Sequence, residues 1–207
     1  MLARTMALSG ALAPPVFVLS AVIATLATPG YSSVGATFSE LARPGAPWGW
    51  LISAGFVGYG LLVQPLGPLL HAVAGRGWLA RALWGLVVVY GAGAVLAGVF
   101  RDNHRGLVLW GVPEDTVHDM AARVGFASIL LLTLVVPWAL RGQPSWRAWR
   151  RFSLVVAVLS AMLVSAFQLE AWPEGRGLLQ RGFFLTTMAW VEVTALWLYR
   201  LASRPAS

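Results

Sequence analysis

The sequence predicts an all-α, polytopic integral membrane protein, a bundle of six transmembrane helices joined by short loops. Two observations support this prediction. Of the 207 residues, 58% are hydrophobic and only 11% are charged, whereas soluble globular domains carry about 25% charged residues. The hydrophobic residues also gather in long runs, and a transmembrane helix needs about 20 mostly apolar residues in succession. We therefore treat residues 1–207 as a single transmembrane domain.

Six runs meet this length requirement. Glycines recur inside them, as in GFVGYG and YGAGAVLAG, and small residues let helices approach closely in lipid. The loops between the runs are short, so neighbouring helices should pack antiparallel. The expected spans cover residues 8–28, 48–70, 78–100, 117–140, 151–169 and 178–201.

The first run has a second interpretation. A short basic start, an apolar stretch and ATLA at residues 24–27 also fit a secretory signal. Pro14 and Pro15 interrupt the run under either interpretation, because proline removes a helix hydrogen bond. We expect a retained helix that is kinked at these prolines, with a cleaved signal as the alternative.

Arginine predicts the orientation in the membrane. All 15 basic residues are arginine, and they are densest in RGQPSWRAWRR, residues 141–151. Because loops rich in basic residues stay in the cytoplasm, we expect this loop and both termini on the cytoplasmic side of the cell membrane. Every acidic residue except Glu192 then falls on the outer side. Acids contribute little to orientation, so this bias is a first indication of a polar outer site.

The composition excludes several classes of function. The chain has no cysteine, which removes thiol nucleophiles, disulfides and cysteine-bound zinc or iron–sulfur centres. It has no lysine either, which removes Schiff-base cofactors and P-loops. The arginines lie at the ends of apolar runs, so nucleic acid is not an expected partner. We expect no cofactor, and we expect membrane lipids as partners. The oligomeric state is left open.

The stretch FRDNHRGLVLWGVPEDTVHDM, residues 100–120, is polar within an apolar chain. Asp102 and His104 follow the third span, and His118 opens the fourth. Imidazole and carboxylate groups act as acids and bases, or bind metal ions. A solvated connection between two helices is the alternative, and no metal site is assigned. Asp102 and His118 are the residues for which no structural role is evident.

Helix capping explains the other acids of this stretch. We expect Thr116 to cap the fourth span, with Asp119 three residues later completing a capping box. Asp119 and Arg123 are four residues apart with the acid first, which favours an ion pair. Glu114 and Asp115 suit the positive end of the helix dipole.

Two further outer segments carry polar side chains. TFSELARPG contains Ser39 and Glu40, and it fits a short helix at the membrane surface. No G-x-S-x-G surrounds Ser39, so a serine hydrolase is not indicated. EAWPEGRGLLQRG places Gln180 and Arg181 at the start of the sixth span. Arginine opposes the dipole there, so we expect an acidic partner for Arg181, or a bound phosphate head group.

Glu192 lies inside the sixth span, below the expected midplane. An ionisable residue at such a depth is costly and is a functional candidate by default. The expected structural alternative is a hydrogen bond to a polar side chain at similar depth. Four such side chains are Tyr59, Gln64, Tyr90 and Thr133.

The order of PGYSSVGATFSELA, GVFRDN, HDMAARVGF and GLLQRGFF resembles a family of small six-helix bacterial and archaeal membrane proteins, domain of unknown function 998. The resemblance covers roughly residues 10–200 and implies no activity. The positions that match the polar motifs of the family are Ser39, Glu40, Asp102, His118, Gln180 and Arg181.

These residues form the predicted ligand site. The leading hypothesis is an outward-facing pocket in which they bind a lipid head group or a small polar molecule. One alternative is a membrane-embedded hydrolase or transferase that acts on a lipid through His118 with Asp102 and Glu40. Another is a proton-coupled transporter that uses Glu192, and a structural subunit without a ligand is the last.

Overall fold

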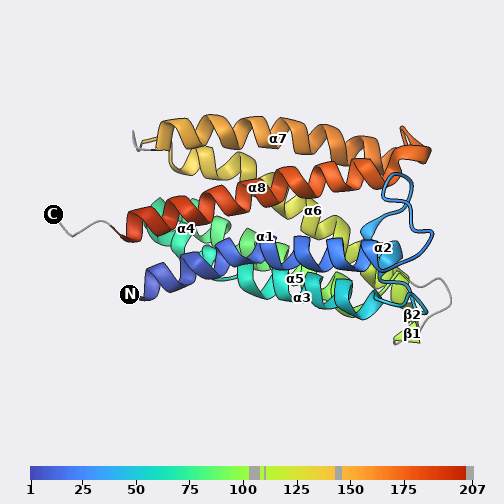
Figure 1. The fold of residues 1–207 in the computed structure, drawn as a ribbon. Coiled ribbons are helices and arrows are strands. Elements are labelled where there is room, and N and C mark those ends of the chain that lie inside the picture. Colours follow the sequence, from blue (N-terminus) through green and yellow to red (C-terminus); the bar gives the residue numbers. More distant parts are fainter. Residues whose placement is uncertain (103–107, 110, 143–145, 204–207) are drawn as a thin grey trace.

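A computed structural model describes residues 1–102, 108–109, 111–142 and 146–203, and it shows an elongated helical bundle (Figure 1). The helices are α1 Leu2–Leu26, α2 Phe38–Leu41, α3 Gly49–Val63, α4 Leu66–Ala74, α5 Trp78–Val99, α6 Glu114–Ala139, α7 Arg147–Gln168 and α8 Arg176–Ala202. A 3-10 turn, η2 (Pro173–Gly175), precedes α8, and the strands β1 (Val108–Leu109) and β2 (Val112–Pro113) pair antiparallel.

Six segments of the described chain are long and apolar enough to cross a membrane, so the predicted all-α bundle of six spans is confirmed. The protein is a multi-pass membrane protein. The second span is made of α3 and α4 in succession, because Pro65 between them has no N–H to continue the helix. By contrast, Pro14 and Pro15 lie inside α1 without ending it.

The six spans form a ring. Each span packs against the spans before and after it in sequence, and α8 packs back against α1. The first and last described residues, Met1 and Ser203, lie at one end of the bundle (Figure 1), where Arg4 Nε donates to Ser203 Oγ at 2.9 Å. The opposite end carries α2, the β1–β2 pair and η2 (Figure 1). We name this opposite end, residues 27–48, 100–102, 108–109, 111–116 and 169–177, the α2 end.

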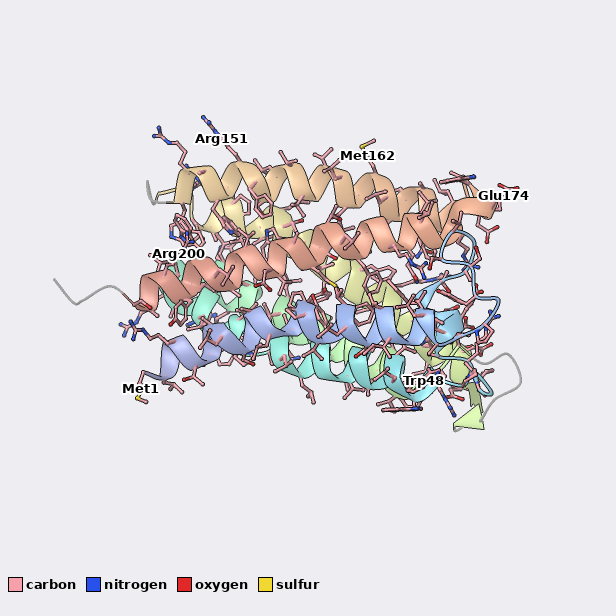
Figure 2. All side chains as sticks on the ribbon, viewed as in Figure 1. Met1, Trp48, Arg151, Met162, Glu174 and Arg200 are labelled. Atoms are coloured by element: carbon pink, nitrogen blue, oxygen red, sulfur yellow. The ribbon has the colours of Figure 1, made fainter. Side chains whose placement is uncertain are left out.

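Aromatic side chains cluster in the interior of the ring, and most of the large hydrophobic side chains exposed on its outside are aliphatic. Phe17 stacks on Phe184 with ring centroids 5.4 Å apart, and the hydroxyls of Tyr59 and Tyr90 are 2.6 Å apart. Met162 of α7 is 65% exposed and points away from the bundle (Figure 2). Such an apolar exterior fits a surface in contact with lipid tails.

Glycines set the distance between α5 and α6. A Cβ atom on Gly93 would lie 2.8 Å from the Ala121 carbonyl oxygen and 3.1 Å from Gly125 Cα. The two backbones therefore approach closely only because position 93 has no side chain. This close packing brings the first turns of α6 against the last turn of α5, which is where the candidate site lies.

We expect Gly93→Ala to lower the unfolding temperature of the protein purified in detergent, because the added methyl group separates α5 from α6 at a cost of about 1–3 kcal/mol. Gly85→Ala is the matched control on the same helix, since a Cβ atom at Gly85 meets nothing within 4 Å. Alanine is the better helix former, so this control should be neutral or stabilising. Equal unfolding temperatures for the two variants would contradict this packing.

Candidate functional site

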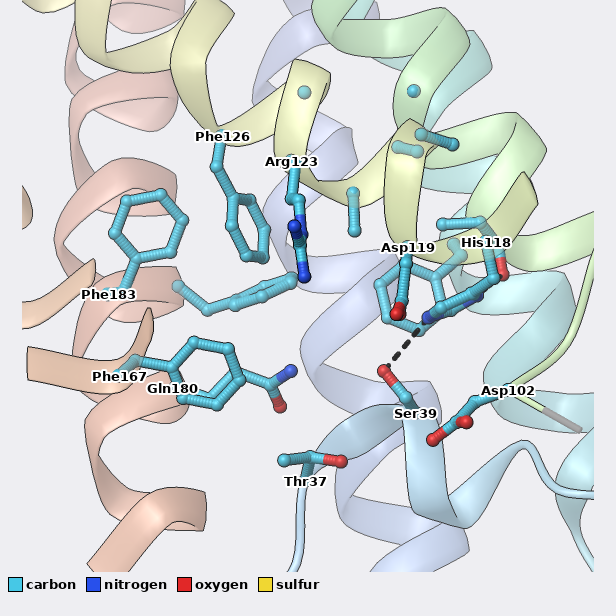
Figure 3. Close-up of a pocket in the computed structure, with 18 of the residues that line it drawn as sticks. Thr37, Ser39, Asp102, His118, Asp119, Arg123, Phe126, Phe167, Gln180 and Phe183 are labelled. Atoms are coloured by element: carbon cyan, nitrogen blue, oxygen red, sulfur yellow. Dashed lines mark hydrogen bonds between the residues drawn. The ribbon is translucent and has the colours of Figure 1, made fainter. Parts of the chain in front are cut away.

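His118 is the centre of the site and is almost fully buried, with 3% of its surface exposed. Its Nδ1 lies 2.9 Å from the Ala97 carbonyl oxygen and 2.8 Å from that of Phe100, and its Nε2 lies 3.1 Å from Ser39 Oγ. Because a carbonyl oxygen only accepts, Nδ1 carries the proton. In the neutral imidazole, Nε2 is then an acceptor for the Ser39 hydroxyl (Figure 3).

This geometry gives His118 a structural role that the sequence does not reveal. The carbonyl groups in the last turn of a helix have no partner within that helix. The Nδ1–H of His118 donates to the carbonyl oxygens of Ala97 and Phe100, at the end of α5. The imidazole therefore joins three segments: α6, which carries it, the end of α5, and α2 through Ser39.

The short helix α2 presents Ser39 to His118. Thr37 is its N-cap residue, and the Thr37 hydroxyl oxygen accepts from the Glu40 backbone N–H at 3.3 Å. The Thr37 hydroxyl also lies 3.4 Å from Glu40 Oε1, where it donates to the carboxylate. Glu40 is therefore engaged in capping α2, and it is not among the residues that line the pocket described next.

A pocket of about 130 Å³ opens beside this hydrogen bond and extends into the ring of helices. Of the six residues predicted to bind a ligand, Ser39, Asp102, His118 and Gln180 line it, whereas Glu40 and Arg181 do not. Figure 3 shows polar side chains from α2, α6 and α8 around one space. The aromatic wall of the pocket consists of Phe56, Tyr59, Tyr90, Phe126, Phe167, Phe183 and Phe184.

Gln180 points its amide into this pocket in a fixed orientation. The residue is 5% exposed, and its Oε1 accepts the backbone N–H of Phe38 at 2.7 Å. Since only the oxygen of the amide can accept this bond, Nε2 must face the pocket (Figure 3). Gln180 thereby offers two N–H donors to a ligand, and it also ties α8 to the start of α2.

Asp119 and Arg123 line the same pocket, and the capping role predicted for Asp119 is wrong. The helix α6 begins at Glu114 with Pro113 at the N-cap, so Thr116 lies inside the first turn and caps nothing. No ion pair joins Asp119 to Arg123 within the described residues, although they are four apart. Both side chains are exposed to the pocket space (Figure 3), so both charges are available to a ligand.

Two further acids at this end, Asp102 and Glu114, link separate segments of the chain. Asp102 lies 3.4 Å from Arg43 Nη2, and its side chain is 16% exposed. Glu114 is 5% exposed and accepts the backbone N–H of Arg101 at 2.8 Å, which links the start of α6 to the end of α5. The sequence predicted only an interaction of Glu114 with the helix dipole, and it did not predict this hydrogen bond to Arg101. His104 lies outside the described residues.

Arg181 has no carboxylate partner in the described chain, so the predicted acidic partner is wrong. Its Nη1 donates to the carbonyl oxygens of Ala36 at 2.7 Å and Gly177 at 3.0 Å, and its Nη2 donates to the Tyr31 hydroxyl at 2.5 Å. Burial raises the pKa of Tyr31, while Arg181 opposes this shift. The ring of Phe38 lies against the guanidinium, with its centroid 4.5 Å from Arg181 Cζ. These groups replace a carboxylate as the partners of the cation.

Comparison with known proteins places the chain in a family. A family model described as "Protein of unknown function (DUF998)" matches residues 11–197. The chain belongs to the DUF998 family. The resemblance inferred from the sequence motifs is confirmed. Neither the search of curated proteins nor the search of solved structures finds a match.

Glu192 of this DUF998 protein is isolated from the pocket. Its Oε2 is buried without a hydrogen-bond partner among the described residues. The partners expected for it are engaged elsewhere, as in the Tyr59–Tyr90 pair. Glu192 lines neither the pocket nor the groove described below. Within the described residues, no three histidine or acidic side chains are grouped closely enough to hold a metal ion.

Proposed function

We propose that this DUF998 protein binds an amphiphilic ligand, a lipid head group or a small polar molecule, in the pocket beside His118. The observation that supports this proposal most strongly is the pair of opposite charges on the pocket wall, Asp119 and Arg123, which make no ion pair in the described chain. Charges in a membrane protein are costly unless they are paired or solvated. A ligand that carries both charges would pair with both side chains.

The rest of the lining supports a ligand with a polar and an apolar part. Gln180 Nε2 is fixed toward the pocket by the bond between Gln180 Oε1 and the Phe38 N–H. Beyond this amide, the wall is aromatic, with Phe126 and Phe183 in T-shaped contact at 4.6 Å. Ligand pockets are commonly mostly apolar, with few placed polar groups. A zwitterionic head group with a short apolar extension matches this distribution.

Asp119→Asn and Arg123→Gln should weaken binding of a short-chain phosphatidylethanolamine by about tenfold each, because each removes one charge-assisted hydrogen bond. The measurement is the rise in unfolding temperature of the detergent-purified protein as this lipid is titrated. Arg151→Gln, at the opposite end of the bundle (Figure 2), is the matched control and should bind as the unmodified protein does. Identical titration curves for all four proteins would contradict the proposal.

The pocket is proposed to face outward from the cytoplasmic membrane. The α2 end is poorer in arginine than the end that carries the termini and Arg147, Arg150 and Arg151. Basic loops stay on the cytoplasmic side, so the α2 end is the exterior one.

A single cysteine at Glu174, at the α2 end, should react with a membrane-impermeant maleimide in intact cells. A single cysteine at Ser203, at the opposite end, should react only after the cells are permeabilised. The chain contains no native cysteine, so each signal reports one position. The reverse pattern would overturn the proposed orientation.

Nucleophilic catalysis is the second candidate function, and one observation favours it. Ser39 Oγ lies 3.1 Å from His118 Nε2, within the range for a serine and its general base. This pair could not be predicted from the sequence, because the two residues are 79 positions apart in the chain. The third group that orients the base is a pair of backbone carbonyls, those of Ala97 and Phe100, and not a carboxylate.

In this candidate reaction, His118 Nε2 takes the proton of Ser39 as Oγ attacks the carbonyl carbon of a lipid ester. The carbon–oxygen bond to the alcohol breaks, the departing alkoxide takes the proton from His118, and an acyl-serine remains. Water, activated by the same Nε2, then releases the carboxylic acid and restores Ser39. The Nε2 donors of Gln180 face the same pocket and are candidates to stabilise the oxyanion.

A fluorophosphonate probe should label the purified protein at Ser39, because this probe reacts with serines activated by a base. Ser39→Ala should abolish labelling, and His118→Gln should slow it by about 10²–10⁴-fold. Ser32→Ala, in the same connecting segment, is the control and should label normally. Absence of labelling in the unmodified protein would eliminate this candidate and leave the binding function standing.

A further inference from the structure

An apolar groove separate from the pocket runs along the outside of the bundle between α1 and α8. It has a volume of about 330 Å³, and Phe17, Ala21 and Leu26 of α1 line one side of it. Leu185 and Met188 of α8 line the other. Leu26 is 82% exposed and Leu185 is 62% exposed, so the groove opens away from the bundle. In a membrane, this opening faces the lipid.

Among the described residues, the only charged side chain that lines this groove is Arg181. The guanidinium has five N–H donors, and its contacts with Ala36, Gly177 and Tyr31 use three of them. The two remaining N–H groups, on Nε and Nη2, have no partner in the described residues. Nε and Nη2 form one edge of the planar fork, which matches the oxygens of a phosphate group.

The position of Arg181 along the groove matches the polarity of a lipid. Arg181 lies near the start of α8, next to the α2 end, whereas Met188 lies seven residues deeper, or about 10 Å at 1.5 Å per residue. The cation is therefore at the interfacial end of the groove, and the apolar lining continues toward the middle of the bilayer. A lipid fits this arrangement when its head group lies at Arg181 and its acyl chain lies along the apolar lining between α1 and α8.

We propose that this groove is a binding site for a membrane phospholipid, whose phosphate contacts Arg181 and whose acyl chain lies between α1 and α8. The site is distinct from the pocket beside His118, because Arg181 does not line that pocket. The adjacent residues Gln180 and Arg181 thus serve two cavities. Phe184 lines both cavities, and the centroid of its ring lies 5.4 Å from that of Phe38, which lines the groove.

The test uses the full-length protein reconstituted in phosphatidylcholine vesicles that contain a phosphatidylglycerol with a photoreactive group on its acyl chain. After irradiation, mass spectrometry of peptides measures labelling of α1 and α8. Diacylglycerol with the same chain is the probe without phosphate. Val22→Trp fills the groove from an exposed position of α1, and Val158→Trp is the same substitution at an exposed position of α7 outside it.

Phosphatidylglycerol should label the groove peptides of the unmodified protein and of the Val158→Trp variant equally. It should label those of the Val22→Trp variant only weakly. Arg181→Gln should lower this labelling by about tenfold, through loss of charge-assisted hydrogen bonds, without changing the labelling by diacylglycerol. Equal labelling of Val22→Trp and Val158→Trp would overturn the groove as the site. Equal labelling by the two probes in the unmodified protein would overturn the role of Arg181. Neither result bears on binding in the pocket beside His118.

Discussion

The hydrogen bonds of the buried His118 imidazole are the contacts on which the α2 end depends. One N–H satisfies the final carbonyls of α5, and this fixes the other nitrogen as the acceptor that holds Ser39 and α2. The close approach of α5 and α6 at Gly93 places His118 within reach of those carbonyls. Without this link, Ser39 would lose its partner on α6, and only the bonds from Gln180 and Arg181 on α8 would hold the start of α2.

The fold was predictable because the bilayer imposes a simple rule on sequence: a span needs a run of apolar residues long enough to cross it. The exact ends of the helices depend on local contacts and not on this rule. Pro65 divides the second span, and α6 begins at Glu114, directly after β2, so Thr116 is not at the capping position. The sequence therefore matches the capping-box pattern, but the box does not form, and Asp119 faces the pocket.

Much of the site was also visible in the sequence, since polar side chains in an apolar chain are few. Their pairing was not visible, because it depends on contacts between distant segments. Arg181 illustrates this limit: backbone carbonyls and the Tyr31 hydroxyl surround its charge, and no sequence rule predicts them. Consecutive helix positions point about 100° apart, which explains why Gln180 and Arg181 line different cavities.

Occupancy of the pocket beside His118 is the direct test of the proposed function. The decisive measurement is an experimental structure of the protein in nanodiscs prepared with lipids of its own membrane. We expect non-protein density that contacts Asp119, Arg123 and Gln180 and continues along the aromatic wall. A pocket without such density, in which Arg123 has closed onto Asp119 as an ion pair, would contradict a ligand-binding function.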